Sequence, residues 1–179
     1  MVGDVPIGGG APIAVQSMTN TDTRDVDATV AQIKRLEAVG CEIIRLAVLD
    51  VKAAESIQAI RAQISIPVIA DIHFDSRLAV AAMEHGAQGI RINPGNIGGS
   101  AKLARVVDAA KAHQVSIRVG VNSGSVEKDI LARYGHPTPV ALVASALRNI
   151  ALLEKMDFRE IKVSIKSSDV LTTIDAYRQ

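Results

Sequence analysis

The sequence predicts an α/β fold in which parallel strands alternate with helices, and three features indicate it. Short apolar segments alternate six times with segments that have the apolar spacing of a helix. Hydrophobic residues make up 48% of the 179 residues, enough for one sizeable core. No Gly-x-Gly-x-x-Gly motif follows the first strand, which argues against a dinucleotide-binding doubly wound sheet.

The six βα units follow a glycine- and proline-rich lead-in at residues 1–12, which we expect to be a short hairpin or an irregular segment. The predicted strands cover residues 13–18, 42–48, 67–72, 89–93, 116–122 and 161–166. The predicted helices cover residues 26–39, 51–63, 76–85, 101–113, 138–155 and 169–179, and the longer connection after the fifth strand contains residues 128–134. Thr138 and Pro139 are a capping hydroxyl and a first-turn proline, a typical helix start.

Consecutive βα units favour a parallel sheet with right-handed crossovers. A closed (β/α)8 barrel needs about 250 residues, and two more units of roughly 30 residues each would nearly reach that length. We therefore predict a TIM-type barrel in which residues 13–179 supply units one to six and the last two units are absent from this chain. The first and sixth strands would then be open edges, so pairing with a second copy is a hypothesis.

Composition excludes several classes of function. The chain has 20 basic and 19 acidic residues without a long block of either, which gives little support to binding of nucleic acid or a membrane surface. No apolar run approaches the ~18 residues of a membrane span. The first residues lack the basic start and apolar run of a secretion signal, so we expect a soluble cytoplasmic protein. Cys41 is the only cysteine, which excludes an all-cysteine metal or cluster site within this chain.

Polar side chains recur near the C-terminal ends of the predicted strands, the end that carries the active site of a barrel. Along a strand Arg91 and Asn93 share a face, and Ile90 and Ile92 share the other. The same period-two pattern selects Arg45, Asp71, His73, Arg118, Asn122, Lys162, Ser164 and Lys166. Four or five cations at one mouth repel one another unless an anion lies among them, and arginine suits phosphate oxygens. Helix N-termini and the Gly98-Gly99-Ser100 turn at this end would add backbone donors, so we predict a phosphate or diphosphate site.

Structural roles remain open for single residues in this set. One arginine could simply pair with Asp71 or Glu42, but the recurrence on four strands favours a shared site. Asp71 and His73 could form part of a metal site, yet no third ligand stands at a convincing spacing, so we predict none. We expect the other three histidines at the surface and Cys41 buried at the opposite end from the site.

Five segments together resemble a known family. They are residues 15–21 (VQSMTNT), 70–74 (ADIHF), 91–98 (RINPGNIG), 120–125 (GVNSGS) and 162–166 (KVSIK). In this order they resemble the 4-hydroxy-3-methylbut-2-enyl diphosphate synthases, iron–sulfur enzymes of the methylerythritol phosphate pathway of isoprenoid biosynthesis. The resemblance runs nearly end to end through the chain and covers only the barrel part of the family's protein.

The resemblance implies an oxidoreductase that opens 2-C-methyl-D-erythritol 2,4-cyclodiphosphate and reductively removes a hydroxyl. It implies two electrons from flavodoxin or ferredoxin and a [4Fe–4S] cluster. In the family a C-terminal domain holds that cluster on three cysteines and a glutamate, and in the bacterial homodimer it caps the partner's barrel. None of those cysteines occurs in this chain, so we expect the chain alone to be inactive.

The resemblance also implies roles for individual residues. Arg45, Arg91, Arg118 and Lys166 would clamp the diphosphate, and Asp71, His73, Asn93 and Asn122 would orient the substrate, with Ser164 as a weaker candidate. No residue is assigned a catalytic role. Two alternative functions are also consistent with the sequence. The first is a different phosphate-binding barrel enzyme, such as an aldolase, an isomerase or a pterin-type transferase, and the second is a fragment that binds anions without catalysis.

Overall fold

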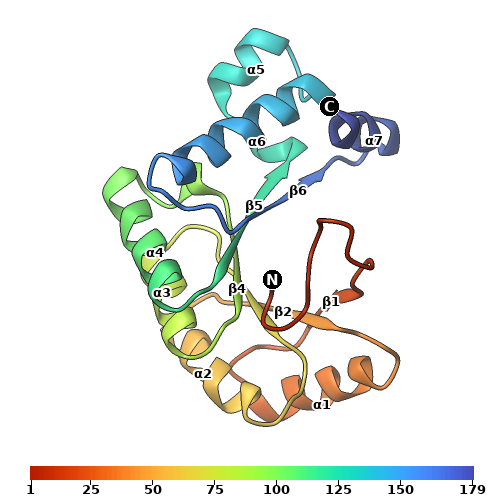
Figure 1. The fold of residues 1–179 in the computed structure, drawn as a ribbon, viewed down its shortest axis with the longest axis vertical. Coiled ribbons are helices and arrows are strands. Elements are labelled where there is room, and N and C mark those ends of the chain that lie inside the picture. Colours follow the sequence, from red (N-terminus) through yellow and green to blue (C-terminus); the bar gives the residue numbers. More distant parts are fainter.

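The computed structural model describes residues 1–179 and contains one parallel sheet of six strands, in the order β1-β2-β3-β4-β5-β6 (Figure 1). The strands are β1 (Gln16–Met18), β2 (Ile43–Ala47), β3 (Val68–Asp71), β4 (Gly89–Ile92), β5 (Ser116–Asn122) and β6 (Ile161–Lys166). The helices are α1 (Val26–Glu37), α2 (Val51–Arg61), α3 (Ser76–Glu84), α4 (Ser100–Ala112), α5 (Lys128–Tyr134), α6 (Pro139–Glu154) and α7 (Val170–Arg178), with short 3-10 turns η1 (Pro94–Asn96) and η2 (Ser123–Ser125).

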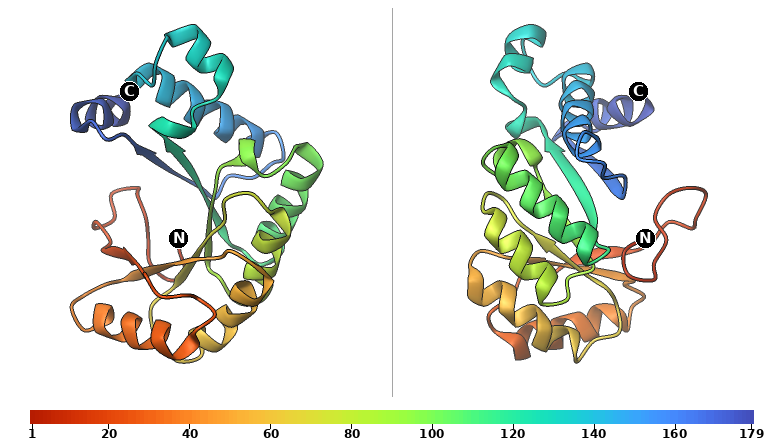
Figure 2. Two further views of the ribbon diagram at one scale, coloured as in Figure 1. Left: turned by 180° about the vertical axis from the view of Figure 1, so that it is seen from behind. Right: turned by 60° about the vertical axis from the view of Figure 1, so that its left-hand side comes forward.

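The sheet curls, and its helices lie on the convex side, as the two views of Figure 2 show. Every strand pairs in parallel with the next strand in the sequence, so β1 and β6 are the edges. This arrangement confirms the predicted α/β fold as a partial TIM barrel of six βα units. The first strand is shorter than predicted: its pairing with β2 begins at Gln16, opposite Ile43, and the preceding Ile13 and Val15 are exposed.

Side chains of the residues before the helices fix where several helices begin. Asp25 and Asp50 accept hydrogen bonds from the backbone N–H groups of Ala28 and Ala53 at the starts of α1 and α2. Thr138 accepts from Ala141 N–H and Pro139 follows it, which confirms the predicted start of α6. The loops before α1 and α2 follow the parallel strands β1 and β2, so they lie at the C-terminal end of the sheet.

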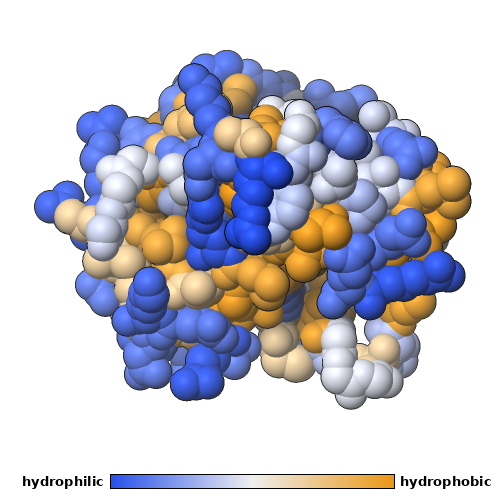
Figure 3. All heavy atoms as spheres, turned by 90° about the horizontal axis from the view of Figure 1, so that it is seen from above, coloured by the Kyte–Doolittle hydropathy of each residue, from blue (hydrophilic) through white to orange (hydrophobic).

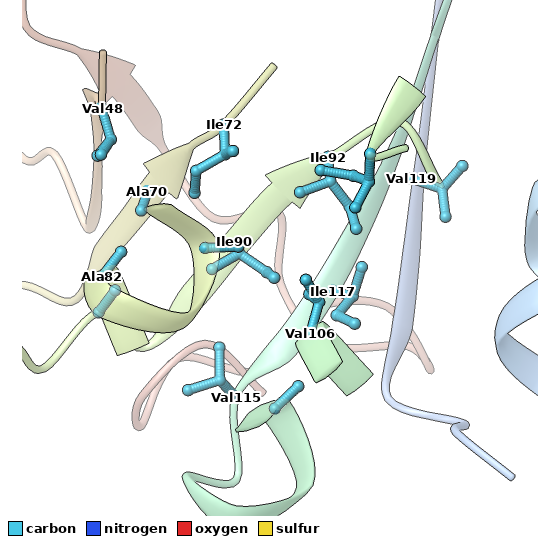
Figure 4. Close-up of a cluster of buried hydrophobic side chains, with 14 of the residues drawn as sticks. Val48, Ala70, Ile72, Ala82, Ile90, Ile92, Val106, Val115, Ile117 and Val119 are labelled. Carbon is cyan, nitrogen blue, oxygen red and sulfur yellow. The ribbon is translucent and has the colours of Figure 1, made fainter. Parts of the chain in front are cut away.

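The main core fills the space between the sheet and the helices (Figure 4). Ile90 and Ile92 of β4 point to this layer and are fully buried, with Val106 of α4 packed in the same cluster. Burying an isoleucine contributes about 1.5–3 kcal/mol, so this layer holds β4 in place with Arg91 directed to the other face.

A second, smaller cluster lies on the concave face. Val2, Ile43 and Ile69 are buried together there, and Val5 packs against them. An antiparallel bridge joins Val2 to Val5 within the lead-in. Figure 1 shows the lead-in on the concave side of the sheet. Because these apolar residues sit at the beginnings of the strands, the polar residues of the concave face gather at the strand ends.

The outer surface is mixed in character. Figure 3 looks down on the end of the molecule that carries α5, α6 and α7, where apolar surface lies among polar surface. Helix α7 contributes the exposed side chains of Val170, Leu171, Ile174 and Tyr177. None of the helices combines the length and the apolar character needed to cross a membrane.

Candidate functional site

A polar cavity of about 320 Å³ opens at the C-terminal ends of the strands. Its walls come from the ends of β2 to β6 and the loops that follow β3, β4 and β5. The lining residues are Arg45, Asp71, His73, Phe74, Arg91, Asn93, Asn96, Gly120, Asn122, Ser125 and Lys166. Only one of them is hydrophobic, so the cavity suits a charged, hydroxyl-bearing ligand.

Asp71 joins two arginines at the base of this cavity. Its Oδ2 lies 3.4 Å from Arg45 Nε and its Oδ1 lies 3.2 Å from Arg91 Nη1. All three side chains are largely buried, with exposed fractions of 6%, 15% and 11% for Asp71, Arg45 and Arg91. The carboxylate therefore fixes both guanidinium groups before a ligand arrives.

Strand register explains why these groups meet. Asp71 of β3 is the neighbour of Arg91 in β4, and Arg91 is the neighbour of Arg118 in β5. Met18 of β1 is likewise the neighbour of Arg45, and its Sδ accepts contacts from Arg45 Nε at 3.3 Å and Nη2 at 3.2 Å. Side chains at neighbouring positions leave the sheet on the same face, so these residues share the concave side.

Positive charge exceeds negative charge here. Burial, followed by the charges of Arg45, Arg91 and Arg118, lowers the pKa of Lys166. Burial and the charge of Arg45 also lower the pKa of Arg118. A pair of unit charges about 4 Å apart interacts by about 4 kcal/mol at an effective dielectric constant of about 20, so one carboxylate cannot cancel four cations. The site is arranged to accept an anion.

The amide groups of the cavity are held by the loops after β4 and β5. Asn93 is 8% exposed, and its Oδ1 accepts a hydrogen bond from Gly95 N–H at 3.0 Å, which begins the η1 turn. Ser125 Oγ donates to the backbone oxygen of Asn122 at 3.2 Å. The bond from Gly95 orients the Asn93 side chain, and amides can both donate to and accept from ligand oxygens.

Most of the predicted site residues line the cavity, and three do not. Lys162 lies near the start of β6, where its Nζ donates to the backbone oxygen of Met1 at 2.8 Å. Arg118 lies behind the lining, with its Nε buried and without a hydrogen-bond partner. Ser164 of β6 is the neighbour of Gly120 and lies outside the lining as well. The Gly98-Gly99-Ser100 turn, expected to offer backbone donors, is also absent from the lining.

Four lining residues were not selected from the sequence. One of them, Gly120, lies on β5 between Arg118 and Asn122. Phe74, Asn96 and Ser125 lie in loops beyond the strand ends, where a period-two pattern no longer applies. Each falls in or beside a segment that carries the family resemblance, and that was the signal available to find them.

The residues of this chain do not fit an iron–sulfur cluster. No group of three or more His, Cys, Asp and Glu side chains is placed to hold a metal ion. Cys41 is buried before the start of β2, where its Sγ donates to the backbone oxygen of Ile43 at 3.2 Å. A single buried thiol at that end cannot supply the ligands of a cluster at the cavity.

Comparison with known proteins gives a family for the whole chain. The family model of the GcpE TIM-barrel domain matches residues 1–179. Proteins named 4-hydroxy-3-methylbut-2-en-1-yl diphosphate synthase (flavodoxin) from Desulfotalea psychrophila and Lawsonia intracellularis are 61% and 62% identical to it. The matches cover 99% of this chain and 50% and 49% of those proteins. The chain thus spans about half the length of the curated relatives it matches.

Solved structures of a more distant group share the fold. Dihydropteroate synthase from Xanthomonas albilineans in complex with 7,8-dihydropteroate has a TM-score of 0.62 and 18% identity, covering 92% of this chain and 63% of that chain. The enzyme from Vibrio fischeri ES114 has a TM-score of 0.62 and 13% identity, covering 92% and 65%. At such identities the likeness shows the barrel fold alone. From its full-length match to the family model, the chain belongs to the GcpE TIM-barrel family.

Proposed function

We propose that this chain is the substrate-binding barrel part of a 4-hydroxy-3-methylbut-2-enyl diphosphate synthase. The substrate in this proposal is 2-C-methyl-D-erythritol 2,4-cyclodiphosphate. The observation that carries it is the convergence of Arg45, Arg91 and Lys166 on one polar cavity. It is supported by relatives that bear that enzyme's name and are about 60% identical over nearly all of this chain.

The cations of the cavity bind the diphosphate. Arg45 and Arg91 already have fixed orientations through Asp71, so they lose little side-chain freedom when an anion binds. Lys166 has no carboxylate within ion-pair distance among the salt bridges of the structure and is free to meet a phosphate oxygen. Arg118 adds positive potential from behind the lining, where it does not touch the ligand space.

The polar neutral groups orient the carbon skeleton. Asn93, Asn122 and Ser125 offer donors and acceptors to hydroxyl groups that the diphosphate clamp brings within reach. His73 is exposed at the rim, with its ring 6.0 Å from the ring of Phe74. The chain's own contribution is therefore binding and orientation of the cyclic diphosphate.

The reduction itself needs groups that this chain does not hold. Opening the ring and removing a hydroxyl as water consumes two electrons. The names of the relatives include flavodoxin, and we propose flavodoxin as the donor here. Because the residues of this chain do not fit an iron–sulfur cluster, the proposal places such a cluster on another part of the protein, in a homodimer.

Calorimetric titration of this chain with the cyclic diphosphate tests the proposal. We expect saturable binding that weakens by about tenfold in Lys166→Ala, because a charged hydrogen-bond donor is lost. Lys155→Ala is the matched control: it removes the same charge from the exposed C-terminal end of α6, outside the cavity lining. Binding should weaken with added salt in all three proteins.

Two results would count against the proposal. Equal losses in Lys166→Ala and Lys155→Ala would mean that net charge, rather than this cavity, governs binding. No preference for the cyclic diphosphate over inorganic phosphate would instead favour another phosphate-binding barrel enzyme.

A further inference from the structure

A buried amide on α6 ties together the two loops that carry the asparagines of the cavity. Asn149 is fully buried, and its Oδ1 accepts from Gly95 N–H at 3.0 Å. Its Nδ2 donates to Glu127 Oε1 at 3.0 Å and to the backbone oxygen of Ser145 at 2.9 Å. Gly95 belongs to the loop after β4, and Glu127 ends the loop after β5.

Both loops contribute residues to the cavity lining. The first holds Asn93 and Asn96, and the second holds Asn122 and Ser125, all of which line it. Gly95 N–H also donates to Asn93 Oδ1, so a single backbone hydrogen links the Asn149 side chain to a lining residue. Asn149 itself is absent from the lining, and it acts on the cavity only through these partners.

The bonding pattern allows only one orientation of the Asn149 amide. Its oxygen faces an N–H donor, and its nitrogen faces a carboxylate and a carbonyl, so a flipped amide would lose all three hydrogen bonds. The same region leaves Glu127 Oε2 and Ser145 Oγ buried without partners. Burying polar atoms without hydrogen-bond partners costs free energy of folding. The Asn149 hydrogen bonds persist despite that cost, and the two loops that they join both line the cavity.

We propose that Asn149 is a positioning residue that sets the distance between the Asn93–Asn96 loop and the Asn122–Ser125 loop. It thereby determines how well the cavity recognises the hydroxyl-bearing part of the ligand, while the cations on the strands bind the diphosphate without it. This inference rests on the proposed function for the identity of the ligand, and on the hydrogen bonds of Asn149 for the positioning role.

The test compares two probes, the cyclic diphosphate and inorganic pyrophosphate, in calorimetric titrations of this chain. In Asn149→Leu we expect about tenfold weaker binding of the cyclic diphosphate, and pyrophosphate affinity within about twofold of the original protein. A purely structural loss would weaken both ligands alike. Ser145→Ala is the matched control: it removes a buried hydroxyl one turn earlier on α6 and keeps the backbone oxygen that Asn149 uses. Its affinity for both probes should not change.

A second readout needs no ligand. Hydrogen exchange at the Gly95 amide, followed by NMR, should be at least about tenfold faster in Asn149→Leu, while amides within α6 stay protected. Unchanged exchange at Gly95, or equal weakening of both probes, overturns the inference. If the protein without substitutions binds neither probe, the proposed function is wrong. The hydrogen-exchange measurement at Gly95 then still decides whether Asn149 positions the loop.

Discussion

The guanidinium of Arg91 lies directly over the Cα of Gly120. A Cβ at position 120 would lie 2.7 Å from Arg91 Nη2 and 2.8 Å from Arg91 Cζ, closer than side-chain carbons approach other atoms. Gly120→Ala should therefore displace Arg91 from Asp71 and from the cavity. We expect affinity for the cyclic diphosphate to fall by about tenfold or more, since a charged hydrogen-bonding contact is lost, as measured by calorimetry.

Gly124→Ala provides the matched control for that substitution. Gly124 lies in the η2 turn, and a Cβ there would meet no atom within 4 Å. The same methyl group is added close to the site without contact with Arg91, so affinity should stay the same. If Gly120→Ala also binds as well as the original protein, Arg91 does not need its position over Gly120.

Removing the Asp71 carboxylate should make stability depend on anions. Asp71→Asn leaves two largely buried guanidinium groups facing one another without a counter-charge. Breaking a buried ion pair in this way costs on the order of 3 kcal/mol. We expect urea unfolding to show that loss of stability in the variant. Added pyrophosphate should raise the free energy of unfolding of the variant more than that of the original protein. Equal gains from pyrophosphate in both proteins would show that Asp71 is not the counter-charge of these arginines.

The fold could be predicted because each element follows local rules that the packing does not override. Period-two apolar patterns, as in Ile90 and Ile92, and capping residues such as Thr138 mark strands and helix starts without knowledge of their neighbours. The first strand was the exception: Ile13 and Val15 look like strand residues, yet both are exposed and the paired register with β2 begins only at Gln16. Apolar pattern alone cannot show whether a partner strand extends that far.

The candidate site could be predicted only in part. The period-two pattern places Arg91 and Arg118 on one face, and they are paired neighbours on β4 and β5, yet only Arg91 lines the cavity. The pattern alone cannot show which of two neighbouring side chains reaches the ligand space. Asn149 could not be found at all, because a polar residue in a helix usually faces solvent. Its partner Gly95 lies 54 positions away in the sequence, and only the packing of α6 against η1 brings them together.

Binding of the anion should depend on pH through Lys166. Burial and the neighbouring arginines lower the pKa of its amine, and only the protonated amine attracts a phosphate. Affinity should therefore be full below that lowered pKa and fall as the pH rises through it, earlier than for an ordinary lysine of pKa about 10.4. A bound anion raises the pKa again, so the complex should take up protons in this range, as calorimetry in buffers of different ionisation enthalpy would detect.

Lys166→Arg separates this effect from other titrations. Arginine keeps its charge throughout the accessible pH range, so the alkaline decline of affinity and the proton uptake should both disappear. Persistence of the decline in this variant would assign it to another group.

The open edges of the sheet should make the chain self-associate. Strand β6 is an edge, Val163 on it is partly exposed, and α7 beside it carries the exposed apolar residues Val170, Leu171 and Ile174. Part of the edge is already covered, since Ile165 N–H donates to Tyr177 Oη at 3.0 Å. An unpaired edge next to apolar surface is a template for pairing, so small-angle scattering should show a mass that rises with concentration. Val163→Lys places a charge on that edge and should shift the protein toward monomer, while a mass that stays monomeric at high concentration in the original protein would count against pairing through β6.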